Sequence, residues 1–275
     1  MIKLVEFLAL AGFFYWFFLY RPQKAKRVKE QARRDAELFA QKKQAQQAEQ
    51  VEQIVSCNHC AIRLPISDAI THQTRHFCSL AHADSIDVKG WLGYAKSLPS
   101  PNHDPRPLES KIDTVVIHHI SLPDGQFGGV AIEEFFTNQL REEDHPYFKE
   151  IAHLQVSAHF LIKRSGELCQ FVSCSERAWH AGESVLLGRQ RCNDFSIGIE
   201  LEGTGDISFE QAQYLALAKL IGILQKQYSL RYIVGHSDIS PGRKVDPGKT
   251  FDWRRIQELA KKYLNWSDMT IVSAG

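Results

Sequence analysis

The hydrophobic and polar positions divide the chain into segments of very different character. Residues 7–20 are uncharged and almost wholly apolar, whereas residues 22–55 are rich in Ala, Gln, Lys, Arg and Glu. Counted from residue 4, the apolar run would form a helix of roughly 26 Å, close to the ~30 Å hydrocarbon core of a bilayer. The pattern predicts a transmembrane anchor over residues 1–21 and a charged, solvated helical linker over residues 22–55. A buried core helix is the alternative for the first segment.

The charges around the apolar run predict its orientation. A cleaved signal peptide carries its basic residues before the apolar run. Here they follow it, as Arg21, Lys24, Lys26, Arg27 and Lys29. Because basic residues mark the cytoplasmic side of a membrane segment, we expect a single uncleaved N-terminal anchor with the rest of the chain in the cytoplasm.

After residue 91 the periodicity becomes that of a folded α/β domain. Strand patterns are found at residues 113–119, 157–163, 168–172, 196–201 and 232–235. Helical patterns are found at residues 130–140, 208–228 and 254–264. Ser208 and Gln211 have the spacing of a capping box for the second of these helices. Strands interleaved with helices predict a mixed central β-sheet flanked by helices.

Composition excludes several classes of protein. The chain is 44% hydrophobic and 24% charged, and 33 Lys and Arg against 32 Asp and Glu give a net charge of +1. A disordered chain would be less hydrophobic, and a nucleic-acid-binding chain would carry a basic excess. We therefore expect globular parts with appendages and no nucleic-acid partner.

Three of the six cysteines are grouped with histidines in a spacing typical of metal sites. Cys57 and Cys60 are separated by two residues, and Cys78 is followed four positions later by His82. Two such pairs complete a tetrahedral zinc site in small zinc fingers. The sequence predicts a zinc-finger-like module over residues 56–84, with a structural zinc ion. His59, His72 and His76 remain alternatives for the fourth ligand, and cysteines scattered on a loop are the alternative to a metal site.

Candidate catalytic residues lie at or near strand ends. Alternation along residues 113–119 places His118 and His119 on opposite faces, so only one of them can face a given site. Glu200 shares a strand face with Gly198, opposite three apolar side chains, and is a candidate general base. A loop after the strand at 232–235 brings together His236, Lys244 and Asp246. Such loops commonly hold ligands and metals.

Several longer motifs resemble one enzyme family. They are VIHHISLP (116–123), HPYF (145–148), VSAHFLI (156–162), RAWHAG (177–182), RCNDFSIGIELEG (191–203) and PGRKVDPG (241–248). In this order they closely resemble the zinc-dependent N-acetylmuramoyl-L-alanine amidases, particularly the cytoplasmic 1,6-anhydro-muramyl-peptide amidases of peptidoglycan recycling. The resemblance covers residues 91–264 and implies an amidase/peptidoglycan-recognition fold over residues 85–275. It does not cover the first ninety residues, which form an extension.

The resemblance also implies roles for individual residues. By position, the ligands of one catalytic zinc ion fall on His118, His236 and Asp246. Glu200 takes the place of the general acid/base, and Lys244 that of the group that stabilises the oxyanion. The substrate-contacting positions are His119, Trp179, His180, Arg191 and Asn193. His119 and Gln155 stand where family members often have Asn and a basic residue, respectively, so they bear on how the substrate is held.

Together these inferences predict an inner-membrane protein with a cytoplasmic amidase domain that cleaves muropeptides, chiefly 1,6-anhydro-N-acetylmuramyl peptides. Two alternatives stay open: a membrane-tethered periplasmic amidase acting on polymeric peptidoglycan, and a recognition module of the same fold without catalysis. His159 is interpreted as a hydrogen-bonded structural histidine, and Cys169, Cys174 and Cys192 as free thiols. The sequence does not identify a protein partner for the extension.

Overall fold

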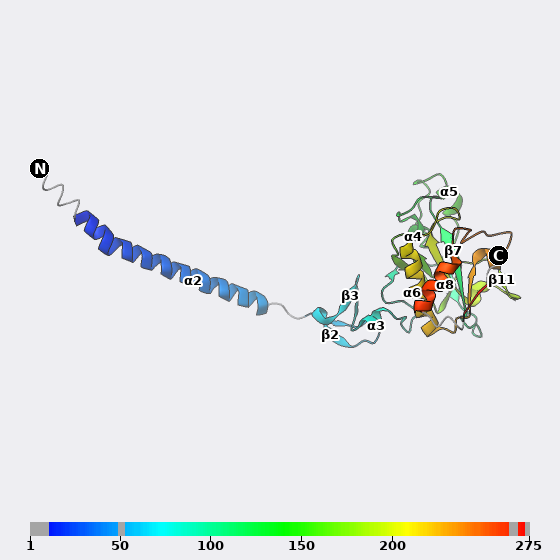
Figure 1. The fold of residues 1–275 in the computed structure, drawn as a ribbon, viewed down its shortest axis with the longest axis horizontal. Coiled ribbons are helices and arrows are strands. Elements are labelled where there is room, and N and C mark those ends of the chain that lie inside the picture. The colour runs from blue at the N-terminus through cyan, green and yellow to red at the C-terminus, as the bar shows by residue number, and fades with distance from the viewer. Residues whose placement is uncertain (1–10, 49–52, 264–268, 273–275) are drawn as a thin grey trace. The chain divides into compact units, whose positions relative to one another are not determined.

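A computed structural model describes residues 11–48, 53–263 and 269–272. By their internal contacts the residues form two compact units, Met1–Gln53 and Ile54–Gly275. Figure 1 shows the helical first unit and, in the second, the elements of the zinc-finger-like module and of the amidase-like domain.

The first unit is helical where the structure describes it. A short π-helical turn, η1 (Trp16–Tyr20), leads into α2 (Arg21–Ala48), which covers most of the predicted linker. Side chains along α2 are paired one turn apart, as with Arg33 and Glu37, whose charged atoms are 2.9 Å apart. Within the described residues, no helix has both the length and the apolar character that crossing a bilayer requires. Residues 1–10 of the predicted anchor and residues 49–52 of the linker lie outside the described residues.

The second unit begins with a small module of short elements around a minimal core. Two hairpins are followed by one helical turn: β1 (Ile54–Ser56), β2 (Arg63–Pro65), β3 (Ile70–His72), β4 (Arg75–Phe77) and α3 (Leu80–Ala83). A 3-10 turn, η2 (Ile66–Asp68), lies between the hairpins in sequence. The buried cluster of this module consists of Cys57, Phe77 and Ala83. So small a core is typical of modules that are stabilised by a metal ion.

The rest of the unit is built on a seven-stranded mixed sheet, in the order β15-β14-β7-β13-β8-β9-β5. Its strands are β5 (Lys96–Ser97), β7 (Thr114–Ile120), β8 (Phe160–Ile162), β9 (Leu168–Gln170), β13 (Ser196–Glu202), β14 (Tyr232–Gly235) and β15 (Thr270–Val272). All neighbours are parallel except β8 and β9. The predicted mixed α/β sheet is therefore confirmed.

Helices α6 (Gln211–Gln227) and α8 (Trp253–Tyr263) pack against each other and cover one face of the sheet (Figure 1). Alternate residues of β7 and β13, including Val115, Ile117 and Ile199, point into this fully buried core. The opposite face packs against α4 (Ala131–Phe136) through a second cluster that includes Phe136 and Leu161. The sheet is thus flanked by helices as expected.

Shorter elements complete the unit. They are α5 (Phe148–Ile151), α7 (His236–Ile239), β6 (His103–Pro105), β10 (Glu176–Ala178), β11 (Val185–Leu186), β12 (Arg189–Gln190) and the 3-10 turn η3 (Cys192–Asp194). β6 pairs with β10, and β11 pairs with β12.

Several sequence-based boundaries were wrong. The capping box of α6 is formed by Glu210 and Gln213, because the helix begins at Gln211 and the predicted Ser208 lies before it. The predicted helix 130–140 ends at Phe136, where the Thr137 hydroxyl donates a hydrogen bond to the Glu133 carbonyl (2.8 Å) and Asn138 adopts a left-handed conformation. The predicted strands 157–163 and 168–172 are shortened to β8 (Phe160–Ile162) and β9 (Leu168–Gln170).

Candidate active site

The carboxyl ends of three parallel strands bring the candidate catalytic residues together. His118 lies near the end of β7, and Glu200 on β13 is its direct partner in the register. His236 follows Gly235, the last residue of β14, on the other side of β7. Since register partners in parallel strands point to the same face, the two sides of β7 supply a carboxylate and a second imidazole beside His118.

His118, His236 and Asp246 converge with one ligand atom each. The Nδ1 atoms of the two histidines are 2.9 Å apart, and Asp246 Oδ2 lies 2.9 Å from His118 Nδ1 and 3.0 Å from His236 Nδ1. A tetrahedral zinc ion with bonds of about 2.0 Å spaces its ligand atoms by about 3.3 Å. Three lone-pair-bearing atoms in this arrangement fit a bound divalent cation, and all three residues are buried.

The protonation of these groups suits metal binding. Burial lowers the pKa of His118 to about 4, an effect strengthened by the nearby His236 and opposed by Asp246. Burial acts to raise the pKa of Asp246, but its contacts with His118 and His236 outweigh this and lower it. At neutral pH the site therefore offers a neutral His118 imidazole and an ionised carboxylate, the forms that ligate a metal.

Glu200 has the environment of a general base. Its Oε2 atom is buried and has no hydrogen-bond partner within the part of the chain that the structure describes. Burial, together with the negative charge of Asp246, raises the pKa of Glu200 well above its ordinary value, and Lys244 opposes this shift. A carboxylate whose proton affinity is raised can take up a proton and release it again during a reaction.

A cavity of about 390 Å³ opens over this group. Its polar part is lined by His118, His236, Glu200 and Lys244, and Lys244 is exposed. Its apolar wall is formed by Leu122, Phe135, Phe136, Tyr147, Ile151, Leu154, Val156 and Trp179. A second cavity of about 300 Å³ shares Trp179, His180, His236 and Lys244 with the first. The candidate reaction centre thus has space on two sides for an extended substrate.

The predicted substrate-contacting residues occupy different positions. Trp179 lines both cavities, and its Nε1–H donates a hydrogen bond to Asp104 Oδ1 (3.1 Å). His119 lines the larger cavity, with its Nδ1 3.1 Å from the Pro247 carbonyl oxygen. Arg191 is exposed, lines neither cavity and pairs with Asp194 at 3.2 Å.

Asn193 and His180 line the second cavity, and both also make contacts inside the protein. Asn193 Oδ1 accepts hydrogen bonds from the backbone N–H groups of His180 (3.3 Å) and Ala181 (2.8 Å). His180 is buried, and its Nδ1 lies 3.0 Å from His118 Nε2. Gln155 lines the second cavity.

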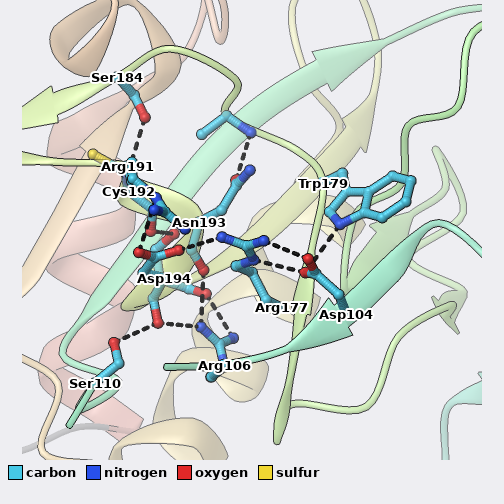
Figure 2. Close-up of polar contacts among 12 residues, drawn as sticks. Asp104, Arg106, Ser110, Arg177, Trp179, Ser184, Arg191, Cys192, Asn193 and Asp194 are labelled. Atoms are coloured by element: carbon cyan, nitrogen blue, oxygen red, sulfur yellow. Dashed lines mark hydrogen bonds and ion pairs between the residues drawn. The ribbon is translucent and has the colours of Figure 1, made fainter. Parts of the chain in front are cut away.

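Sequence reasoning missed a network of charged residues next to Trp179, which lines both cavities (Figure 2). Arg177 binds both Asp104 and Asp194, and Asp104 in turn accepts the Trp179 hydrogen bond. Arg106 donates to the carbonyl oxygens of Asn193 and Asp194, both at 3.0 Å. Asp104 and Arg106 belong to the Pro-rich segment 98–107, and no motif or spacing in the sequence pairs them with Arg177 or Asp194.

His159 has the structural role that the sequence predicted. Its Nδ1 accepts the Gly198 N–H at 3.0 Å, and its Nε2 lies 3.1 Å from the Glu176 carbonyl. Burial lowers the pKa of His159 well below its ordinary value, so it is a neutral imidazole within the sheet.

The zinc-finger-like module contains a second candidate metal group. Cys57, Cys60, Cys78 and His82 place their ligand atoms within 4.8 Å of one another. The sulfur atoms of Cys60 and Cys78 are 3.8 Å apart, and Cys57 Sγ is 3.7 Å from His82 Nδ1. A zinc ion with Zn–S bonds of about 2.3 Å gives spacings of about 3.8 Å. Of the alternative ligands, His59 stacks on His82 and contacts the Ser85 hydroxyl instead, at 3.0 Å.

The chemistry of Cys57 also fits a metal ligand. Burial acts to raise its pKa, but backbone N–H groups of Cys60, Cys78 and His59 and the contact with His82 lower the pKa to about 6. Cys57 is therefore largely a thiolate at neutral pH, the form that binds zinc. Cys169, Cys174 and Cys192 are buried free thiols.

Comparison with known proteins extends these observations. The sequence profile of a family described as N-acetylmuramoyl-L-alanine amidase matches residues 108–249. Over 176 residues the chain is 50% identical to the 1,6-anhydro-N-acetylmuramyl-L-alanine amidase AmpD of Escherichia coli (strain K12), covering 63% of this chain and 96% of that protein. The AmpD of Haemophilus influenzae is 49% identical to this chain over 176 residues, which again cover 63% of this chain and 96% of that protein. A crystal structure of a Se-Met AmpD derivative is similar with a TM-score of 0.61 and 50% identity, covering 62% of this chain and 97% of that one.

Proposed function

Because this chain belongs to the N-acetylmuramoyl-L-alanine amidase family, we propose that it hydrolyses the amide bond between N-acetylmuramic acid and L-alanine in 1,6-anhydro-muropeptides, as a zinc-dependent enzyme of peptidoglycan recycling. The observation that supports this most strongly is the placement of Glu200 beside His118 in the strand register, at a cavity that also contains His236 and Lys244. The donor set of His118, His236 and Asp246 fits a catalytic zinc ion.

The residues of the site divide the reaction between them. His118, His236 and Asp246 would hold the zinc ion, which would polarise the scissile carbonyl and lower the pKa of water at the site toward ~7. Glu200 takes a proton from the attacking water as it adds to the carbonyl carbon. It then passes that proton to the amine nitrogen of L-alanine as the C–N bond breaks. The Lys244 ammonium group stabilises the negative charge that develops on the carbonyl oxygen.

The substrate preference is tested by a side-by-side assay. Full-length protein is incubated with 1,6-anhydro-N-acetylmuramyl peptide and with intact peptidoglycan, and released peptide is measured by mass spectrometry with and without a chelator. The proposal expects chelator-sensitive release from the soluble anhydro substrate alone. Release from the polymer would instead favour a wall-remodelling amidase, and binding without release from either would favour a recognition module.

A second, structural zinc ion is proposed for Cys57, Cys60, Cys78 and His82. Its support is the convergence of the four ligand atoms, all within 4.8 Å of one another, and the lowered pKa of Cys57. A closed set of four protein ligands leaves no position for a substrate, so the role of this ion is to stabilise the module.

We also propose that the protein is held at the inner membrane by its N-terminal anchor, with the amidase domain in the cytoplasm. The support is the apolar run of residues 7–20 and the basic residues that follow it. A reporter enzyme fused after Gly275 tests the orientation. Activity of a cytoplasm-specific reporter in a membrane fraction is expected, and activity restricted to the periplasm would contradict the proposal.

A further inference from the structure

Two consecutive residues, His180 and Ala181, contact the two proposed ligand histidines on the side away from the ligand group. His236 Nε2 lies 3.0 Å from the Ala181 carbonyl oxygen. His118 Nε2 lies 3.0 Å from Nδ1 of His180, whose ring packs edge-on against that of His118. The Nε2 atoms of the two imidazoles thus contact two residues that are consecutive in the sequence, Ala181 for His236 and His180 for His118.

The hydrogen bonds behind His118 have only one consistent direction. The Ser196 hydroxyl donates to the Cys192 carbonyl oxygen at 2.6 Å, so toward His180 Nε2, 3.1 Å away, it offers a lone pair. A neutral His180 therefore carries its proton on Nε2 and has a free lone pair on Nδ1. That lone pair accepts the Nε2–H of His118. The Nδ1 lone pair of His118 is left pointing at His236 and Asp246.

The contact behind His236 has the same effect. A carbonyl oxygen can only accept, so His236 donates its Nε2–H to Ala181 and keeps its Nδ1 lone pair for the ligand cluster. This carbonyl also accepts a hydrogen bond from Arg243 Nη2 at 2.7 Å, and Asn193 holds the same segment through its Oδ1, which accepts the backbone N–H groups of both His180 and Ala181. Both proposed ligand imidazoles are therefore set in the tautomer that a metal at Nδ1 requires.

The surrounding structure makes this arrangement rigid. A Cβ atom on Gly198 would lie 2.4 Å from Cγ of His180, so the ring packs directly on the backbone of β13. Arg106 donates to the carbonyl oxygens of Asn193 and Asp194, both at 3.0 Å (Figure 2), and to that of Ser196 at 2.8 Å. The turn that contains Asn193 and the start of β13 are thus both bound by one partly buried guanidinium group.

We infer that His180, Ser196 and Asn193 are positioning residues, which set the tautomer and direction of the His118 and His236 imidazoles, and that His180 and Asn193 do not serve chiefly to contact the substrate. This inference rests on the proposed zinc site. Hydrogen bonds to metal-bound imidazoles typically change metal affinity by about 10- to 100-fold when they are lost.

The test uses cobalt(II) as the probe, bound to full-length protein and titrated against a chelator. Thiolate charge-transfer absorption reports the cysteine group, and the weaker visible bands report the histidine and aspartate group, so each protein carries its own control. The informative pair is H180N and H180Q. The amide oxygen of an Asn can occupy the position of His180 Nδ1 and accept the hydrogen bond from His118. The amide group of a Gln instead reaches the position of His180 Nε2.

H180Q and S196A are expected to weaken cobalt binding at the histidine and aspartate group by about 10- to 100-fold. H180N is expected to retain more of the affinity than H180Q. The thiolate signal should be unchanged throughout. S173A is the matched control, because Ser173 also donates to a backbone carbonyl, that of Lys89 at 2.6 Å, but its hydroxyl oxygen accepts from the Ser175 N–H at 3.1 Å and not from a histidine of the site.

Equal cobalt affinity in wild type, H180Q and S196A would overturn the inference, and a raised KM for the anhydro substrate in the same variants would reassign His180 to substrate binding. Should S196A fail to fold, the comparison of H180N with H180Q decides. If wild type and these variants all bind metal equally and cleave the substrate, the inference is contradicted but the proposed function is not. A wild-type chain that binds no metal at this group contradicts the proposed function as well.

Discussion

Glu200 lies in surroundings that disfavour its negative charge. It is flanked by Asp246, its Oε2 has no hydrogen-bond partner within the described part of the chain, and burial raises its pKa. Those features are unfavourable for stability and favourable for moving a proton. The residue pattern predicted Glu200 as a candidate base, because alternation on its strand sets it opposite three apolar side chains. The same pattern could not predict which tautomer His180 adopts, because that depends on a hydrogen bond between the Ser196 hydroxyl and the Cys192 carbonyl oxygen.

Replacement of Glu200 by Gln keeps the size of the side chain and removes its ability to take up a proton. The expected result is a fall in kcat by about 10²- to 10⁴-fold, the usual contribution of general acid–base catalysis. Zinc content should be unchanged, because Glu200 is not one of the proposed ligands. Turnover measured by peptide release and zinc measured by elemental analysis check both statements, and undiminished turnover would refute the assigned role.

The raised pKa of Glu200 also predicts how stability depends on pH in the metal-free protein. Between the ordinary carboxyl pKa and the raised one, the native state holds a proton that the unfolded state has lost, so stability falls as the pH rises. Glu200→Gln removes this effect. In the presence of a chelator, the variant should therefore melt at a higher temperature than wild type at pH 8, with a smaller difference at pH 5. A difference that does not depend on pH would contradict the assigned environment of Glu200.

The sequence pattern predicts most of the strands and helices that carry the residues of the site. The strands 113–119, 196–201 and 232–235 were predicted close to their observed bounds, because apolar runs in a buried sheet give a strong signal. Element ends were predicted less well. α6 begins after Glu210 because its cap is formed by Glu210 and Gln213, and α4 ends early because Asn138 turns the chain. Ends of this kind depend on single hydrogen bonds and tertiary contacts, which a periodic pattern does not contain.

Gly198 tests whether the sheet determines the geometry of the site. A Cβ atom there would lie 2.4 Å from the His180 ring, so Gly198→Ala should displace that ring. Overpacking of this sort costs about 1–3 kcal/mol of stability. We expect a lowered melting temperature together with weakened metal binding. Gly129→Ala is the matched control, because the nearest atom to its Cβ is 4.0 Å away. Normal metal binding by the Gly198 variant would mean that the ring can move without consequence.

The second unit as a whole combines two candidate metal groups with different tasks. The segment that follows the cysteine group enters the core of the amidase-like domain, where Ile86, Leu92 and Ala95 are buried. Arg75 of the zinc-finger-like module donates to the Leu92 carbonyl at 2.9 Å, and Gly93 packs closely on Ala83. The cysteine spacing alone predicted the metal group, but these contacts join residues that no motif relates. Loss of the metal from the cysteine group should therefore lower the stability of this unit.

Cys60→Ser tests the structural metal. Zinc content should fall from two ions per chain to one, and the melting temperature should decrease, whereas kcat should be largely unchanged because the proposed catalytic ligands are all elsewhere. Cys169→Ala is the matched control, since it removes a buried thiol that lies outside both metal groups. Elemental analysis and thermal unfolding provide the measurements. An unchanged zinc content in Cys60→Ser would contradict the proposed site.

Reconstitution of the full-length enzyme tests the proposed zinc amidase most directly. Protein stripped of metal by a chelator is assayed for peptide release from 1,6-anhydro-N-acetylmuramyl peptide while zinc is added back, in parallel with Asp246→Asn. We predict that stripped wild type is inactive and regains activity with zinc, and that the variant, which has lost its carboxylate ligand, does not at the same zinc concentration. Full activity of the stripped protein, or equal recovery by Asp246→Asn, would contradict a zinc amidase built on His118, His236 and Asp246.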